Sequence, residues 1–136
     1  MKIELSINKT GQINKISVLI SFINESAEAT NLPLERIRIN AARSGLAIRD
    51  DSGRLEPIEF DIVKPVDNLQ EMEVLPSESV DLEVEGEIVK KSENVYGVLF
   101  PHATYKVELN KPYDVDFGWG GFRSEPIEFV FEFEST

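Results

Sequence analysis

The sequence predicts an all-β protein, a two-sheet antiparallel sandwich of about eight strands. Its apolar residues recur with period two far more often than with period 3.6, which is the pattern of strands with one buried face. The alternating segments are short, are separated by turns rich in Gly, Pro, Asn and Asp, and lack the pattern of crossover helices. A closed barrel is the second fold compatible with these features. At 136 residues the chain has the length of one domain, and we expect residues 1–136 to form a single domain.

The first third of the chain contains three alternating segments. Residues 2–7 and 16–23 place apolar side chains at every second position, and Asn24 ends the second run. Residues 36–39 continue the pattern, because Ile37 and Ile39 alternate with arginines. We therefore expect three strands here. The only helical pieces expected anywhere are short ones around residues 25–30 and 65–71, and neither has an apolar stripe.

Turn signals divide the remainder of the chain. The sequence DDSG at residues 50–53 lies between apolar runs, and Gly53 can adopt a positive φ without steric cost, so a β-hairpin is predicted. Residues 76–79 form another turn before the alternating segment 80–85. Two further alternating segments complete the set of expected strands, at residues 105–109 and 127–134.

The sequence EPIEF occurs twice, at residues 56–60 and 125–129. The rest of the two halves does not align at the same offset, so the repeat does not indicate a duplication. Proline suits the first residue of a strand, and Ile and Phe two positions apart can fill one face while Glu stays in solvent. We expect each copy to begin a strand whose apolar pair faces the core: Ile58 with Phe60, and Ile127 with Phe129.

The order of these segments resembles bacterial immunoglobulin-like accessory domains. The likeness is carried by ISVLISFINES, LAIRDDSGRLEPI, EVLPSESVDLEVE, TYKVELN and SEPIEFVFE, which together cover most of residues 14–133. In such domains an early strand ends in Asn, an Asp-Gly hairpin follows, a Leu-Pro turn with Ser precedes an alternating strand, and a strand containing Tyr comes late. The Cys and central Trp of antibody domains are missing. The resemblance implies an immunoglobulin-like sandwich, a fold that serves binders, inhibitors, spacers and enzyme appendages alike.

Composition narrows the function classes. The chain has no cysteine, which excludes thiol catalysis and Cys-ligated metal sites. Residues 1–49 hold four acids and seven bases (net +3), whereas residues 50–136 hold 21 acids and seven bases (net −14). Such an acidic surface repels nucleic acid and anionic lipid, so we expect no nucleic-acid or membrane partner and favour a basic protein partner. The N-terminus lacks the pattern of a signal peptide and no apolar run is long enough to span a membrane, which predicts a cytoplasmic protein.

The sequence offers little for catalysis or cofactors. The single histidine, His102, follows a proline and belongs to no catalytic motif. Asp114 and Asp116 lie on one side of an extended segment and could support acid–base chemistry, but 25 acids in 136 residues make such pairs common. Asp50 and Asp51 lack the spacing of a calcium loop, and the glycine-rich GWGG matches no phosphate-binding motif. We therefore predict a protein that is not an enzyme, with no cofactor and no metal.

Two surfaces are predicted as candidate protein-binding sites. The stretch KPYDVDFGWGGFRSEP combines glycines with large aromatic side chains, as contact loops do, although the same side chains could instead cap the core. Its candidates are Tyr113, Phe117, Trp119 and Phe122. The second surface is a row of carboxylates that point to one side of a strand, namely Asp81, Glu83, Glu85 and Glu87. A second acidic row, Glu128, Glu132 and Glu134, should lie apart from the first, or both should be interleaved with bases such as Arg36, Arg38 or Lys106.

These features lead to two hypotheses of different classes. The first is a non-catalytic immunoglobulin-like binding domain, an inhibitor or immunity-type protein that masks a basic protein. The second is a structural or assembly domain that forms homo-oligomers or joins a larger complex through its sheet edges. An enzyme that uses Asp114 and Asp116 is a third and weaker alternative.

Overall fold

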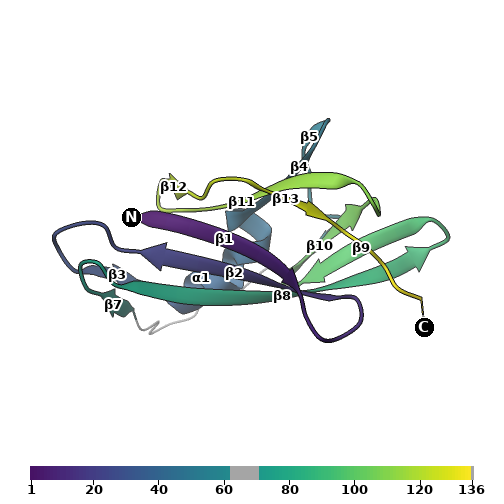
Figure 1. The fold of residues 1–136 in the computed structure, drawn as a ribbon. Helices are drawn as coiled ribbons and strands as arrows, with labels where there is room; N and C mark the ends of the chain where they lie inside the picture. Colours follow the sequence, from purple (N-terminus) through teal and green to yellow (C-terminus); the bar gives the residue numbers. More distant parts are fainter. Residues whose placement is uncertain (62–70, 136) are drawn as a thin grey trace.

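The computed structural model describes residues 1–61 and 71–135 of the chain (Figure 1). The described residues form thirteen strands, one α-helix (α1, Leu34–Asn40) and one turn of π-helix (η1, Ala41–Gly45). In chain order the strands are β1 (Lys2–Lys9), β2 (Lys15–Ile23), β3 (Thr30–Leu32), β4 (Leu46–Asp50), β5 (Gly53–Arg54), β6 (Glu59–Phe60), β7 (Met72–Val74), β8 (Ser79–Ser92), β9 (Val95–Phe100), β10 (Ala103–Val107), β11 (Pro112–Trp119), β12 (Phe122–Arg123) and β13 (Ile127–Val130). Neither of these helical segments is long and apolar enough to cross a membrane.

The strands form two main antiparallel sheets and a small third one. The six-stranded sheet has the order β1-β2-β8-β9-β10-β6, and the five-stranded sheet has the order β12-β11-β4-β5 with β13 also paired to β11. The two-stranded sheet joins β3 to β7. The all-β prediction is confirmed, and the arrangement is compatible with a β-sandwich. The six-stranded sheet ends at β1 and β6 in the described part of the chain, so it is not the closed barrel considered as an alternative.

The inner faces of the two main sheets share one hydrophobic cluster. On the six-stranded sheet, β2 contributes alternate buried residues, Ile16, Val18, Ile20 and Phe22. On the five-stranded sheet, the buried side chains of β11 are Tyr113, Val115 and Phe117. Phe22 and Phe117 meet edge to face, with ring centroids 6.1 Å apart, so an aromatic pair joins the two sheets directly.

The helix α1 replaces the strand that was expected around residues 36–39, and that prediction was wrong. Leu34, Ile37 and Ala41 follow each other at intervals of three and four residues and pack into the core, which is helical spacing. The ion pair between Glu35 and Arg38 lies on the outside of the same turn. The alternation of two isoleucines with two arginines is therefore incidental. Residues 25–29 are not helical, and residues 65–70 of the other expected helix lie outside the described residues.

Most expected turns and strands are confirmed. The DDSG turn connects β4 to β5, with Asp50 paired to Gly53 and a φ of 112° at Gly53. The alternating segments at 2–7, 16–23 and 80–85 lie within β1, β2 and β8, although β8 runs on to Ser92. The strands missed by the sequence reading include β3, β9 and β12, and β11 as a central strand of its sheet.

The two EPIEF copies have different environments. Ile127 and Phe129 are half-buried against the core, in a strand that pairs with the central strand β11. Ile58 and Phe60 are 50% and 52% exposed, so the expected burial of the first pair is wrong. The neighbouring glutamates Glu56 and Glu59 are exposed as well, which excludes a one-residue slip in register. The first copy ends in β6, a two-residue edge strand.

Tyr105 ties β10 to the π-helical turn. Its phenol is buried and donates a hydrogen bond of 2.5 Å to the carbonyl oxygen of Ala42. Burial raises the pKa of Tyr105, with Glu56 acting in the same direction and Arg54 in the opposite one. Since the pKa is higher in the folded than in the unfolded protein, the unfolded chain releases this proton first. The contribution of Tyr105 to stability is therefore complete below about pH 10 and is lost as the pH rises further.

We expect the free energies of unfolding of the protein and of its Tyr105→Phe variant to approach each other as the pH rises. At about pH 8 the variant should be less stable by about 1 kcal/mol, because the Ala42 carbonyl loses its donor. As the pH rises toward about 11, the free energy of unfolding of the parent should fall toward that of the variant. Urea unfolding of both proteins across this pH range measures the difference. A difference that stays constant with pH would contradict the raised pKa.

Candidate functional site

The predicted acidic row lies on the outer face of β8. Its carboxylates are all exposed, and they alternate with buried residues of the same strand (Leu82, Val84, Gly86 and Ile88). The four acidic positions Asp81, Glu83, Glu85 and Glu87 are therefore on one side of a regular strand, as the sequence predicted. Strand β8 is paired to β2 along residues 79–87, and its pairing with β9 begins at Glu87, the last residue of the row.

The neighbours of this row leave it largely unneutralised. Across β2, the first three acidic residues face Ser21, Leu19 and Ser17, and only Glu87 faces a base, Lys15. The Ser21 hydroxyl donates to the Asp81 carboxylate at 2.6 Å. Within the described residues, none of the four carboxylates forms an ion pair. Of the two predicted arrangements, interleaving with the expected bases is not found in the described residues, because Arg36 and Arg38 lie on α1 and Lys106 lies two strands away on β10.

The second acidic row lies apart from the first, since Glu128 is on the five-stranded sheet and Glu132 and Glu134 follow the end of β13. Glu128 belongs to β13 and faces Asp114 of β11, and Glu132 pairs with Lys9. Beyond β13 the chain runs along the β1–β2 hairpin. There the Asn14 side chain donates to the carbonyl oxygen of Glu134 at 2.9 Å and accepts from its amide at 2.7 Å. This second row is therefore part of the packing of the C-terminal segment.

The predicted aromatic loop is only partly a loop. Tyr113 and Phe117 are buried in the core, so their assignment to a contact surface is wrong. The Tyr113 hydroxyl accepts a hydrogen bond of 2.8 Å from the amide of Glu108. The physical reason is that β11 pairs on both sides, with β4 on one and with β12 and β13 on the other, so every second side chain turns inward. Trp119, the last residue of β11, is half-buried, and Phe122 is 47% exposed.

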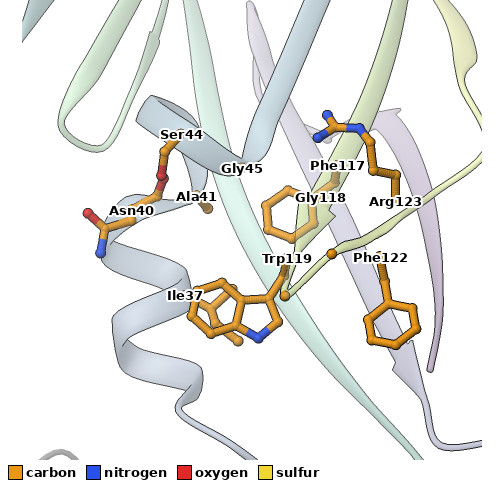
Figure 2. Close-up of a pocket in the computed structure, with 12 residues that line it drawn as sticks. Ile37, Asn40, Ala41, Ser44, Gly45, Phe117, Gly118, Trp119, Phe122 and Arg123 are labelled. Carbon is orange, nitrogen blue, oxygen red and sulfur yellow. The ribbon is translucent and has the colours of Figure 1, made fainter.

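Trp119 and Phe122 lie on either side of a tight turn. Gly120 and Gly121 connect β11 to β12 with φ values of 60° and 84°, which glycine adopts without strain. In Figure 2 the Trp119 indole lies beside Ile37 of α1, while Phe122 points away from it on the other side of the turn. The glycines thus place Trp119 against the helix and leave Phe122 in solvent.

A cavity of about 390 Å³ lies between this turn and the helical segment (Figure 2). Its floor is apolar, with Ile37, Ala41 and Phe117 buried beneath it. A side chain at Gly45 would overlap the Phe117 ring, so the absence of a side chain there lets that ring reach the helical turn. The remaining lining residues are Asn40, Ser44, Gly118, Trp119, Gly120, Gly121, Phe122 and Arg123. The helical side of this cavity was missed by the sequence reading, and the spacing of Leu34, Ile37 and Ala41 is the signal that would have found it.

Asp116 and Asp114 have different surroundings although they share one face of β11. Asp116 accepts from Arg49 at 2.8 Å and from Arg123 at 2.6 Å, one guanidinium on each carboxylate oxygen, and its side chain is only 12% exposed. Asp114 is exposed. The two charge-assisted contacts of this carboxylate link β4 to β12. This geometry gives Asp116 a structural use that sequence reasoning did not find.

His102, the single histidine of the chain, has the Asp61 carboxylate as a charged neighbour. It adopts a φ of 67° in the turn between β9 and β10, and its Nδ1 lies 3.8 Å from the Asp61 carboxylate. The described residues contain no group of three or more His, Asp or Glu side chains placed to hold a metal ion.

The comparisons with known proteins leave the site to be interpreted from its own geometry. No protein-family model matches the sequence, and a search of the curated proteins finds no significant similarity to it.

Proposed function

We propose that the chain is a single immunoglobulin-like domain without catalytic activity, which binds a basic protein through the acidic face of β8. In this proposal it acts as an inhibitor or immunity-type protein that masks its target. The single observation that carries the proposal is the row of exposed carboxylates at Asp81, Glu83, Glu85 and Glu87, of which only Glu87 faces a base across β2. The missing metal and cofactor motifs in the sequence favour binding over catalysis.

The row is suited to a protein partner because its carboxylates are evenly spaced along one strand. Successive carboxylates along a strand stand about 7 Å apart, a spacing that lysines and arginines on a partner surface can match. Like charges in a row repel one another, so a basic partner relieves a cost that the free protein carries. Such complementary charge speeds encounter and makes the complex sensitive to salt.

Half-buried apolar side chains lie next to the acidic row. Leu19 faces Glu83 across β2, and Leu99 faces Glu87 across β9. Polar residues around a small apolar centre are typical of protein interfaces. This neighbourhood supports a protein partner over free small cations.

The proposal predicts that neutralising the row removes binding. The chain, immobilised as bait in an extract of its native cell, should retain a basic protein at low salt and release it at an ionic strength of about 1 M, where charges are screened beyond about 3 Å. The variant Asp81→Asn/Glu83→Gln/Glu85→Gln/Glu87→Gln should retain none of it.

A control of equal charge makes this experiment specific. The variant Glu93→Gln/Glu125→Gln/Glu128→Gln/Glu134→Gln removes four exposed acids from outside the row. It should bind as the parent does. Equal loss in both variants would show that net charge alone matters and would refute a site on β8, and retention by the first variant would refute it as well.

The assembly hypothesis is the second candidate, and the edge strand β1 favours it. This eight-residue strand is an edge of the six-stranded sheet and has a single pairing partner, β2, among the described residues. Open edges can pair with another chain, although Lys2 and Lys9 near its two ends disfavour it. Sedimentation at increasing protein concentration separates the hypotheses. A homo-oligomer that persists in high salt would support assembly through an edge, whereas a monomer would support the binding domain.

A further inference from the structure

The arginines of the chain gather at one part of the fold. All six belong to α1, η1, β4, β5 and β12, which are the segments that form or adjoin the cavity beside Trp119: Arg36, Arg38, Arg43, Arg49, Arg54 and Arg123. Arg123 lines the cavity, and Arg54 donates to the carbonyl oxygens of Ser44 at 3.4 Å and Leu46 at 3.2 Å. The chain as a whole has a net charge of −11. The part of the fold that holds these six arginines is therefore less acidic than the rest of the surface.

The cavity itself carries positive charge only. Its twelve lining residues include Arg123 and no aspartate or glutamate. Arg49 and Arg123 share the carboxylate of Asp116, and Asp114 lies opposite Arg49 on the neighbouring strand. The positive charge in excess of these pairs comes from Arg36, Arg43 and Arg54, which form no ion pair with a described residue. By contrast, the cavity beside the β1–β2 hairpin is lined by two lysines and two glutamates, and the one beside His102 contains Glu59 and Asp61. The Trp119 cavity thus differs from these two in having no acidic residue in its lining.

The apolar part of the cavity has the size and lining of a binding pocket. A volume of about 390 Å³ falls within the range of ligand sites, about 300–1,000 Å³. Ile37, Phe117 and Trp119 form its wall, and Asn40 and Ser44 add polar groups at the helical side. Phe122, the exposed lining residue on the other side of the turn, offers a ring that an extended segment leaving the cavity would cover more fully than a small ligand.

We propose that this cavity binds an acidic protein segment, with one large apolar side chain inserted beside Trp119 and flanking carboxylates placed near the arginines. The occupant is argued from charge complementarity and from the exposed Phe122, which together match an apolar side chain flanked by acids. The proposal does not depend on the acidic face of β8, since the two surfaces lie on different elements and would take partners of opposite charge.

Trp119 provides the readout, because it is the only tryptophan of the chain and lines the cavity. The probes are synthetic peptides of equal length: phenylalanine flanked by glutamates, phenylalanine flanked by lysines, and serine flanked by glutamates. The first should shift the Trp119 emission to shorter wavelength with saturation, and the other two should not. Absence of a saturable shift with the first peptide, or equal binding of the lysine peptide, would overturn the proposal.

Substitutions at Ser44 test the charge at one position. Ser44 is exposed, so neither a glutamate nor a lysine should disturb the core. Ser44→Glu should weaken binding of the acidic peptide by about two- to fivefold, and Ser44→Lys should strengthen it by a similar factor, as expected for one exposed charge pair. The same effect from both variants would contradict recognition by charge.

Phe122→Ser tests the apolar contact, with Ile13→Ser as its control. Phe122 is 47% exposed beside the cavity, and Ile13 is 52% exposed beside a different one. Phe122→Ser should lower the affinity for the acidic peptide by about tenfold, and Ile13→Ser should leave this affinity unchanged. A fourth probe, N-acetylphenylalanine, distinguishes a site for small carboxylates from a site for an acidic protein segment. If it binds as tightly as the acidic peptide, the site is one for small carboxylates and the protein segment is refuted.

Discussion

Replacing Phe117 with alanine is expected to lower the free energy of unfolding by about 3–5 kcal/mol. The Phe117 ring is 1% exposed, meets Phe22 of the other sheet edge to face and occupies the space left free at Gly45. Its removal would open a cavity where the two sheets are joined. Urea unfolding, followed by the emission of Trp119, measures the change.

The matched control is Phe122→Ala, five residues further along the same hairpin. Because Phe122 is 47% exposed, its truncation should change stability by no more than about 0.5 kcal/mol. The two variants distinguish a residue that stabilises the core from one that binds the peptide. Phe117→Ala should unfold more easily, whereas Phe122→Ala should keep its stability and bind the acidic peptide more weakly. Similar losses of stability in both variants would contradict the placement of β11 in the core.

Replacing Asp116 with asparagine is expected to lower the free energy of unfolding by about 2–3 kcal/mol. The substitution keeps the size of the side chain but leaves Arg49 and Arg123 without their shared anion, and it weakens the link between β4 and β12. The two guanidinium groups are partly exposed, which limits the cost compared with a fully buried pair. Thermal or urea unfolding at neutral pH measures it.

Asp114→Asn is the control for this prediction. Asp114 lies two residues earlier on the same face and is exposed, so its neutralisation should change stability by no more than about 0.5 kcal/mol. A second check removes Arg123 as well. In the Asp116→Asn background, Arg123→Gln should cost less than it does alone, because the pair no longer interacts. Equal costs of Arg123→Gln in both backgrounds would contradict the coupling.

The strands that sequence reading found were those with one buried face. In β2 and in residues 82–88 of β8 every second residue is nonpolar and buried, so the pattern of side chains and the pattern of burial are the same. The acidic row was predicted for the same reason, since it is the solvent side of that alternation. Its position relative to Lys15 and Ser21 needed the strand pairing, which no local pattern contains.

The errors occurred where burial depends on distant neighbours. Ile37 and Ile39 alternate with arginines as in a strand, but the core accepts Ile37 together with Ala41 from the next turn, and the segment is a helix. Tyr113 and Phe117 stand beside glycines as in a contact loop, but pairing on both sides makes β11 central and turns them inward. In both cases a tertiary contact selected one of two conformations that the local sequence allows.

The two copies of EPIEF show most directly which features the local sequence specifies and which depend on the tertiary structure. By itself, EPIEF specifies an extended segment whose Ile and Phe lie on the same side, and residues 125–129 enter a strand in which Ile127 and Phe129 are half-buried. The same letters at residues 56–60 end at an edge, where Ile58 and Phe60 are half-exposed and Arg43 lies 4.6 Å above the Phe60 ring. The sequence alone determined the all-β character, the turns and the exposed acidic row, because these follow from local periodicity. Only the tertiary structure decided which apolar side chains are buried, because burial requires a neighbouring strand or helix to cover them.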